Sequence, residues 1–439
     1  MSSPPPPARI DRRLAAALRA AMVVIICIAT LVGLDPDWSV ADAIGRLGRA
    51  LLPRLVPSDV IDGLRNLVLF AALGVAWRIT TERRDDRAAL RQVVLVGFGL
   101  SVAIEVIQAI SPVRNSSVID VITDTLGTWI GAALMTRLIR AMAAARGRPS
   151  YFGVPAWLLA GPYGIAVVCE AVGPLFRQER LPLSGSPLLR VDAALRLAHL
   201  LPSSPIVWAD VMLDAVLFAP AGALAYAALA ERRYTPRRAL WEIALVSTVA
   251  MTLAELVHGV FSMEIVPLAM IAHVGGVVAG AVIAARSLAA FSRARRGAAR
   301  ARVIYVCYAI WICLWSLRPF KPDLDGSDLA QQLDATRLVP MLSLAGRQDL
   351  YSVTHVGVVC ALFVPIGAML AVWPLRRSGA LANLRPALAA AVLLELGHLV
   401  IAGRYFDLTN MLLSAAGVAL GWLLTHHGGL GTYGEALPQ

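Results

Sequence analysis

Charged side chains are scarce in this sequence: Asp, Glu, Lys and Arg make up 16% of its 439 residues. Soluble domains carry roughly 25%, and the mean hydropathy of +0.68 points away from water as the main solvent. The sequence also lacks a nucleotide-binding loop, the patterns HExxH, GxSxG and CxxC, and any polar stretch long enough to form a soluble domain. Soluble-enzyme chemistry is therefore not expected.

Cysteines are few and are not arranged for disulfides or metal ligation. All five lie inside apolar stretches without CxxC spacing, so the sequence predicts neither a disulfide framework nor a metal site, and no cofactor. The net charge of +11 comes from small arginine groups between apolar blocks, such as Arg83, Arg84 and Arg87. This distribution predicts anionic lipid headgroups as partners, with no nucleic acid.

Apolar residues fall in blocks of about 18–24, the length that a helix needs to cross about 30 Å of hydrocarbon. The sequence predicts an all-α, polytopic transmembrane bundle of about twelve helices in a bacterial inner (cytoplasmic) membrane. The helices are expected at 14–34, 60–79, 89–110, 118–139, 154–176, 207–230, 240–262, 265–289, 303–318, 352–373, 387–403 and 408–428.

The charges in the loops predict the orientation. The N-terminal segment and every second loop are short and basic, whereas other loops are longer and contain aspartates such as Asp35, Asp37 and Asp323. The positive-inside rule then places both termini in the cytoplasm. Residues 1–13 and 429–439 are expected to be cytoplasmic tails, the first of them disordered.

A long internal repeat is visible in the apolar motifs. Leu-Phe-x-x-x-Gly begins at Leu69, Leu217 and Leu362, and an intramembrane glutamate follows each copy, at Glu105, Glu255 or Glu395. A polar residue lies three positions after each glutamate: Gln108, His258 and His398. Three copies at matching helix positions predict three four-helix units, over 14–148, 149–300 and 301–428.

The first and third units resemble the VanZ-like family. The first has Asn66 to Phe70 and Gly74, then Glu105, Gln108, Arg114, Asp120 and Asp124-Thr-Leu-Gly127; the third has Phe363-Val-Pro-Ile-Gly367, Glu395, His398, Arg404, Asp407, Asn410 and Gly417. Ala72 and Asp124 replace the proline and asparagine usual in the family. The resemblance implies a small envelope membrane protein; one family member is linked to teicoplanin resistance, and the family has no firmly established activity.

The polar residues are expected to converge near the outward end of each unit. Glu105 lies six residues before Ser111, roughly 9 Å below that end at 1.5 Å per residue. A carboxylate there costs ~2.5 kcal/mol or more unless it is protonated, paired or facing a wet cavity. Arg114 at the hairpin tip, and Arg404 in the third unit, are predicted to fold back towards these carboxylates. The glycines after Asp124 are predicted to let helices approach closely.

We predict that these pockets bind or move an amphiphilic ligand: a lipid, a lipid-linked glycan or a lipoglycopeptide. The candidate ligand-binding residues are Glu105, Gln108, Arg114, Asp120, Asp124, Glu395, His398, Arg404, Asp407 and Asn410, with Asn66, Glu255 and His258 as secondary members. No metal ligand and no catalytic residue is assigned.

Three alternatives stay open. One is a proton- or ion-coupled secondary transporter, and another is an intramembrane enzyme with Glu105 or Glu395 as base and His398 as acid. The third is a scaffold in which the polar sets hold the helices together as buried pairs. The sequence favours a non-enzymatic function and does not indicate an oligomeric state.

Overall fold

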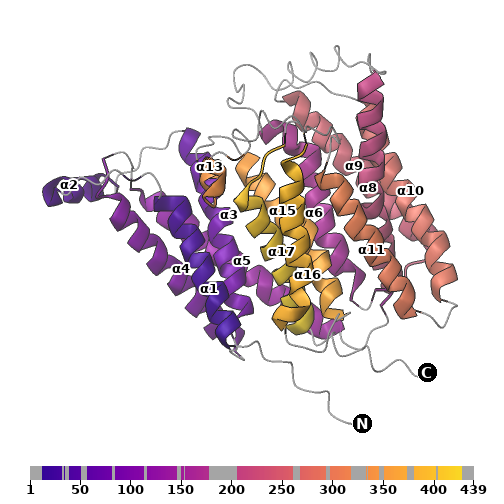
Figure 1. Cartoon of the computed structure of the whole chain (residues 1–439), viewed down its shortest axis with the longest axis horizontal. Coiled ribbons are helices and arrows are strands. Elements are labelled where there is room, and N and C mark those ends of the chain that lie inside the picture. The colour runs from indigo at the N-terminus through magenta and orange to yellow at the C-terminus, as the bar shows by residue number, and fades with distance from the viewer. Residues whose placement is uncertain are drawn as a thin grey trace, which may run out of the picture.

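The computed structural model describes residues 12–31, 34, 39–50, 57–81, 85–112, 116–145, 150–152, 154–176, 205–260, 267–292, 297–317, 333, 335–345, 351–372, 380–401 and 404–427. Within these residues every regular element is a helix, and most helices stand side by side (Figure 1). The chain is therefore all-α over its described part. The predicted tails lie outside it, except for Arg12 and Arg13.

A helix lies on each of the twelve predicted ranges. These helices are α1 (Arg12–Leu31), α3 (Pro57–Ile79), α4 (Asp86–Gln108), α5 (Val118–Ala145), α6 (Ala156–Phe176), α8 (Pro205–Glu231), α9 (Pro236–Val260), α10 (Pro267–Ser292), α11 (Gly297–Ser316), α15 (Tyr351–Val372), α16 (Ala380–His398) and α17 (Leu408–His427). Three short helices were not predicted: α2 (Val40–Ala50), α13 (Ala335–Leu338) and α14 (Leu342–Ala345).

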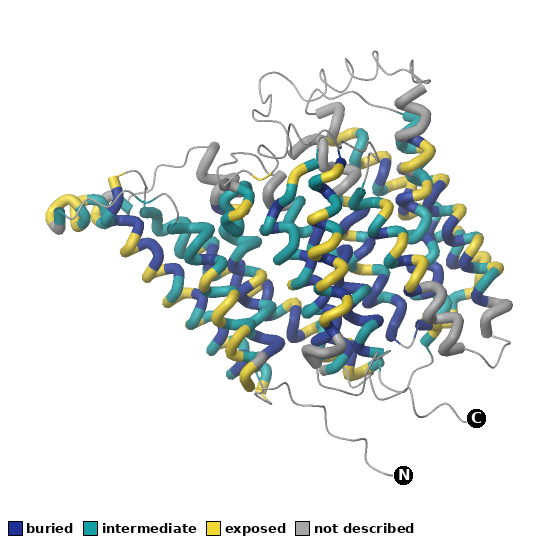
Figure 2. Tube along the Cα trace, viewed as in Figure 1, coloured by how far each residue is buried: buried dark blue, intermediate teal, exposed yellow. Residues whose placement is uncertain are grey.

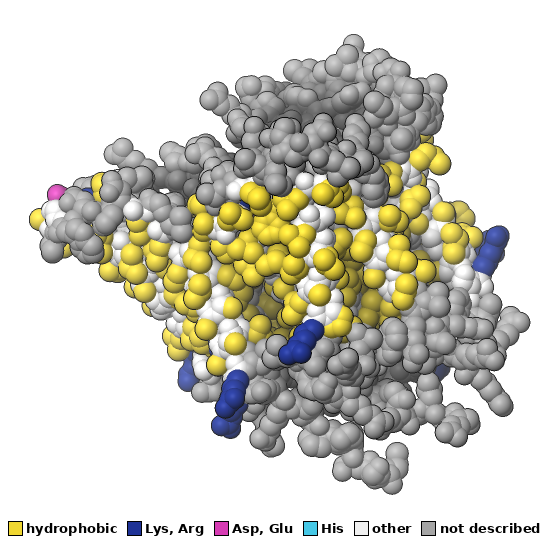
Figure 3. Space-filling model, viewed as in Figure 1, with side chains coloured by type: hydrophobic (Ala, Val, Ile, Leu, Met, Phe, Trp, Pro, Cys, Tyr) yellow, Lys and Arg dark blue, Asp and Glu magenta, His cyan; other side chains and the backbone are white. Residues whose placement is uncertain are grey.

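Among the described residues, seven helices are long and apolar enough to cross a membrane. Their apolar parts are Asp86–Gln108, Val118–Ala145, Val211–Glu231, Pro236–Val257, Pro267–Leu288, His355–Val372 and Leu408–His426, and shorter apolar helices run over Ala15–Leu31, Ala156–Cys169 and Tyr305–Ser316. Hydrophobic side chains cover most of the described surface between the helix ends (Figure 3). This is the surface expected of helices that face lipid.

Three pairs of helices pack at backbone distance: α3 with α5, α15 with α17, and α8 with α10 (left, centre and right in Figure 1). Gly127 faces the carbonyl oxygen of Leu67 and Gly131 faces that of Ala71, so α3 and α5 run parallel. The contacting glycines of the three pairs are Gly74, Gly127 and Gly131; Gly222, Gly276 and Gly280; and Gly367, Gly417 and Gly421.

A Cβ atom at any of these glycines would collide with a backbone carbonyl oxygen of the facing helix. Small residues four positions apart are what close packing of helices in membranes requires. The prediction that glycines allow a close approach of helices holds. The glycines of α5 pack on α3 rather than on α4, because Thr128 on the next face of α5 packs against Gly97 of α4.

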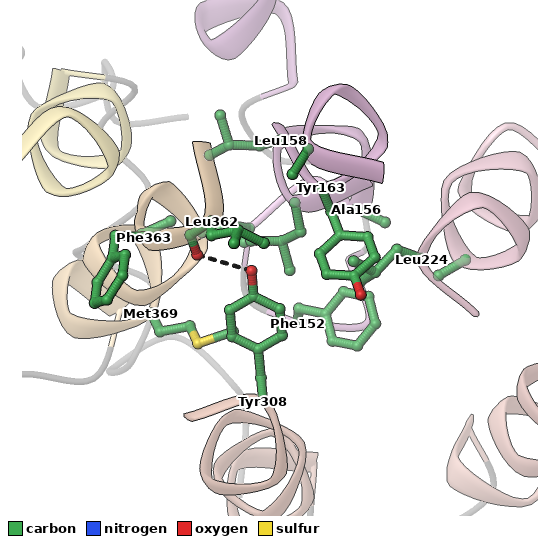
Figure 4. Close-up of a cluster of buried hydrophobic side chains, with 14 of the residues drawn as sticks. Phe152, Ala156, Leu158, Tyr163, Leu224, Tyr308, Leu362, Phe363 and Met369 are labelled. Carbon is green, nitrogen blue, oxygen red and sulfur yellow. Dashed lines mark hydrogen bonds between the residues drawn. The ribbon is translucent and has the colours of Figure 1, made fainter. Parts of the chain in front are cut away.

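Buried aromatic residues hold the middle of the molecule together, where α6 packs between α8 and α15 (Figures 2 and 4). The Tyr308 hydroxyl donates to the Leu362 carbonyl oxygen at 2.8 Å, which links α11 to α15 (Figure 4). The Tyr163 hydroxyl donates to the Leu217 carbonyl oxygen and links α6 to α8 in the same way. In both cases the acceptor is the leucine of the Leu-Phe-x-x-x-Gly motif.

Two arginines link α3, α4 and α5 through Asp86, near the end of α3 and the start of α4. Arg78, 5% exposed, forms an ion pair with Asp86 and donates to the Thr136 hydroxyl at 2.9 Å. The exposed Arg140 donates to the second Asp86 oxygen at 2.8 Å. Asp86 thus accepts from two helices, α3 and α5, at the start of α4.

Candidate functional site

Glu105 connects α4 to the beginning of α5. Its Oε2 accepts a hydrogen bond from the backbone amide of Ser117, the residue before α5, at 2.7 Å. The Ser116 hydroxyl donates to the Glu105 carbonyl oxygen at 2.9 Å. The side chain is buried, with 7% exposure. Because the amide groups at a helix N-terminus favour negative charge, the carboxylate both satisfies and stabilises the start of α5.

Glu395 makes the same connection between α16 and α17. Its Oε2 accepts from the backbone amide of Asp407, the residue before α17, at 3.3 Å. The spacing from glutamate to amide is twelve residues in both cases. Glu395 also lies 3.2 Å from His398 Nδ1, one turn along the same helix.

The residue three positions after each glutamate reaches back to an earlier helix. Gln108 Nε2 donates to the Thr30 carbonyl oxygen at 2.9 Å, near the end of α1. His398 Nε2 lies 3.1 Å from the Ser316 carbonyl oxygen, at the end of α11. These side chains fasten the end of one helix to the glutamate-bearing helix.

Contacts to α3 and α15 complete the two polar sets. Asn66 Nδ2 donates to Asp120 Oδ1 at 3.2 Å, and His355 Nε2 lies 2.6 Å from Asn410 Oδ1. Asp120 and Asn410 each follow the capped helix start by three residues. Each set therefore draws together side chains and backbone groups from four helices at one end of the bundle.

Asp124 distinguishes the polar set around Glu105 from the polar set around Glu395. It is 3% exposed, and its Oδ2 accepts from the Ser101 hydroxyl at 2.7 Å. Its Oδ1 is buried and has no hydrogen-bond partner among the described residues. Asp120 and Glu105 lie near enough to act on it electrostatically. Buried polar atoms are nearly always paired, so an open carboxylate oxygen among three carboxyl groups calls for a missing donor.

In the polar set around Glu395, both carboxylate oxygens of Asp407 have hydrogen-bond partners. Asp407 Oδ1 accepts from the Thr409 amide at 2.8 Å, and its Oδ2 accepts from the Ser343 hydroxyl at 2.7 Å. Ser414 lies three residues before Gly417, as Asp124 lies three before Gly127. α17 thus has a buried serine at the position where α5 has its open carboxylate.

The structure says less about the four remaining predicted residues. Arg114 and the side chain of His258 lie outside the described residues. Arg404 lies in the segment ahead of α17, and Glu255 is half-buried on α9. The predicted pairing of Arg114 and Arg404 with the glutamates stays a prediction. Among the described residues, no group of three or more His, Cys, Asp or Glu side chains is arranged to hold a metal ion.

Sequence reasoning missed the partners Ser117, Ser101, Thr30 and Ser316. Ser117 carried a signal, because Ser117 followed three residues later by Asp120 is close to the capping-box pattern at a helix start. Ser101 lies one turn before Glu105 and so shares its helix face. The carbonyl partners of Gln108 and His398 had no signal, since every residue has a carbonyl group.

One family model matches the part of the chain that contains the polar set around Glu105. Residues 20–140 match the family model VanZ/LLP1. This part of the chain is similar to the VanZ/LLP1 family. The matched region runs from within α1 into α5 and includes Glu105, Gln108, Asp120 and Asp124, so it supports the resemblance read from the sequence. The VanZ/LLP1 domain and the seven apolar helices together indicate a membrane protein. No curated protein and no solved structure matched the chain.

Proposed function

We propose that this chain is a multi-pass protein of the bacterial inner membrane that binds the headgroup of an amphiphilic envelope molecule at the polar set of its VanZ/LLP1 domain. The molecule is a phospholipid, a lipid-linked glycan or a lipoglycopeptide. The protein consists of three diverged four-helix units with both termini in the cytoplasm. The polar sets then open toward the outer leaflet.

Three kinds of contact support the repeat. Glycines meet carbonyl groups in the same parallel register in α3 and α5, in α8 and α10, and in α15 and α17. Tyr163 and Tyr308 bond to the same motif position. Glu105 and Glu395 each cap the helix that begins twelve residues later. The glycine contacts recur in all three units, and each of the other two contacts recurs in two of them.

The open oxygen of Asp124 carries the proposal of a ligand. A buried acceptor without a donor costs about 1–3 kcal/mol, and more when it is charged. An amine, hydroxyl or amide of a lipid headgroup would supply the donor. The neighbouring carboxyl groups of Glu105 and Asp120 favour a headgroup with several donors. Lipid reaches this depth directly because Val102 and Val106 of α4 are exposed on the outside of the bundle.

The test is the mass of lipid that co-purifies with the protein, measured by native mass spectrometry, and its return after delipidation. Asp124→Leu removes the acceptor, and we expect binding to weaken about 10- to 100-fold, the equivalent of about 1.5–3 kcal/mol for a hydrogen bond to a charged group. Asp124→Asn keeps an acceptor oxygen and should retain part of the affinity.

Ser414→Ala is the matched control, since Ser414 holds the corresponding place in α17. It should bind as the unaltered protein does. Arg114→Ala is expected to leave the protein inserted and folded while binding is lost. Equal binding by Asp124→Leu and Ser414→Ala would remove the proposed site.

Proton coupling is the second candidate, and the closeness of Glu105, Asp120 and Asp124 favours it. Adjacent carboxyl groups in a membrane are suited to exchange protons with a cargo. Flux of a bound amphiphile driven by a pH gradient in proteoliposomes, and lost in Glu105→Gln, would select this function. Binding without such flux would leave the binding role alone.

A further inference from the structure

α2 is an amphipathic helix of eleven residues at the edge of the bundle. It begins after Ser39, whose hydroxyl accepts from the Asp42 amide at 3.3 Å, as an N-cap does. At about 100° per residue, Ala43, Ile44 and Leu47 fall on one face. Asp42 and Arg46 fall on the other. α2 runs across the direction of α4 rather than along it (Figure 1).

Arg46 fixes α2 to the end of a membrane span. Its Nε donates to the Ala109 carbonyl oxygen at 2.6 Å, and its Nη2 donates to the Ile110 carbonyl oxygen at 3.1 Å. These residues directly follow α4. Carbonyl groups at a helix C-terminus lack partners in the helix and carry partial negative charge, so a guanidinium is a suitable partner.

The lipid-facing stripe of α4 ends where α2 lies. Phe98, Val102 and Val106 are exposed at four-residue steps along α4, and Val106 is one turn before the carbonyl groups that Arg46 binds. Ile44 of α2 is 64% exposed, which is costly for an isoleucine in water. Figure 2 places α2 at the outer margin of the described bundle, clear of the central helices.

We infer that α2 lies in the headgroup region of the bilayer, with Ile44 in the acyl chains and Asp42 in water. The occupant of its apolar face is lipid, because Arg46 ties the opposite face of α2 to the end of α4, where Phe98, Val102 and Val106 form an exposed apolar stripe. Short helices with a charged and an apolar face bind membranes in this way. α2 is tied to the two residues that follow Gln108, so it fixes the polar set at headgroup depth.

Spin labels at cysteines test this placement in proteoliposomes. The five native cysteines are first replaced by alanine, and single cysteines are introduced as Ile44→Cys and Asp42→Cys, about 160° apart on the helix. Collision with oxygen, which concentrates in the acyl chains, is compared with collision with a water-soluble nickel chelate. We expect oxygen to dominate at position 44 and nickel at position 42, so that the depth parameter changes sign.

Two further labels complete the experiment. Phe98→Cys marks the middle of α4 and should report a greater depth than position 44. A Cβ at Gly48 would meet no atom within 4 Å, so Gly48→Cys gives a tolerated second probe, which should resemble position 44 more than position 42. Nickel-dominated values at both 44 and 48 would overturn the inference. So would shielding of position 44 from both reagents, which would mean that protein covers it.

Discussion

Glu105 decides between two explanations of the buried carboxylate. The sequence interpretation pairs it with Arg114, whereas the structure gives it the Ser117 amide at 2.7 Å. Glu105→Gln keeps an acceptor oxygen for that amide, and Glu105→Leu does not. An unpaired buried donor costs about 1–3 kcal/mol. We therefore expect Glu105→Leu to lose about that much stability and Glu105→Gln to lose about 1 kcal/mol or less.

An ion pair between Glu105 and Arg114 would give another ratio between the stability losses of the Gln and Leu variants. Removing one partner of a buried pair leaves the other charge uncompensated and costs about 3–5 kcal/mol, whichever neutral residue is introduced. Glu105→Gln would then be as harmful as Glu105→Leu. Unfolding by SDS in mixed micelles, followed by far-ultraviolet circular dichroism, measures the difference.

Val106→Leu serves as the control, since Val106 follows Glu105 on α4 and faces outward. This variant should unfold at the same SDS concentration as the unaltered protein. Equal losses in the Gln and Leu variants would refute the capping explanation, and so would a Leu variant as stable as the control. At Glu395, the Gln substitution should also cost more stability than Glu105→Gln does. The reason is that His398 contacts the same Glu395 oxygen that accepts from the Asp407 amide.

Gly131→Leu should separate α3 from α5 and abolish the folded state in the SDS assay, because the side chain would meet the facing carbonyl group; Gly99→Leu on the open side of α4 should be tolerated. Arg78→Ala should cost about 1–3 kcal/mol, since the Arg78 side chain is buried and pairs with Asp86, and the exposed Arg140→Ala less than 1 kcal/mol in the same titration. Tyr308→Phe should lose about 0.5–1.5 kcal/mol through its 2.8 Å bond to a buried carbonyl oxygen.

Hydrophobic length predicted the positions of the long described helices, seven of which are long and apolar enough to cross a membrane, because apolar blocks and polar breaks set the limits of a helix in a bilayer. It failed at short and interrupted elements. α2 has only eleven residues and a charged face, so it gives no apolar block. α16 begins at Ala380, ahead of Pro386, where the sequence favoured a start after the proline. Prolines are tolerated inside membrane helices when neighbours satisfy the freed carbonyl groups.

The polar residues of the site were predictable, but their partners were not. Repetition singled out Glu105, Gln108, Glu395 and His398, because intramembrane polar residues at fixed spacing are rare. Their partners are mostly backbone groups, such as the amide of Ser117 and the carbonyl oxygen of Thr30. Backbone groups are identical at every position, so only the folded helix ends show which of them a side chain meets.

One helix position carries a different side chain in each of the three proposed units, although the neighbouring glycine contacts are the same. The residue three positions before the first contacting glycine is Asp124 in α5, His273 in α10 and Ser414 in α17. His273 stacks on Phe218 with ring centroids 4.1 Å apart, whereas Asp124 keeps one oxygen open. The glycine contacts fix the backbone in all three pairs, so this side chain can change while the helix pair stays in place. A shared packing frame therefore leaves room for the open oxygen of Asp124 at the proposed headgroup site, whereas stacked rings fill the same place in α10.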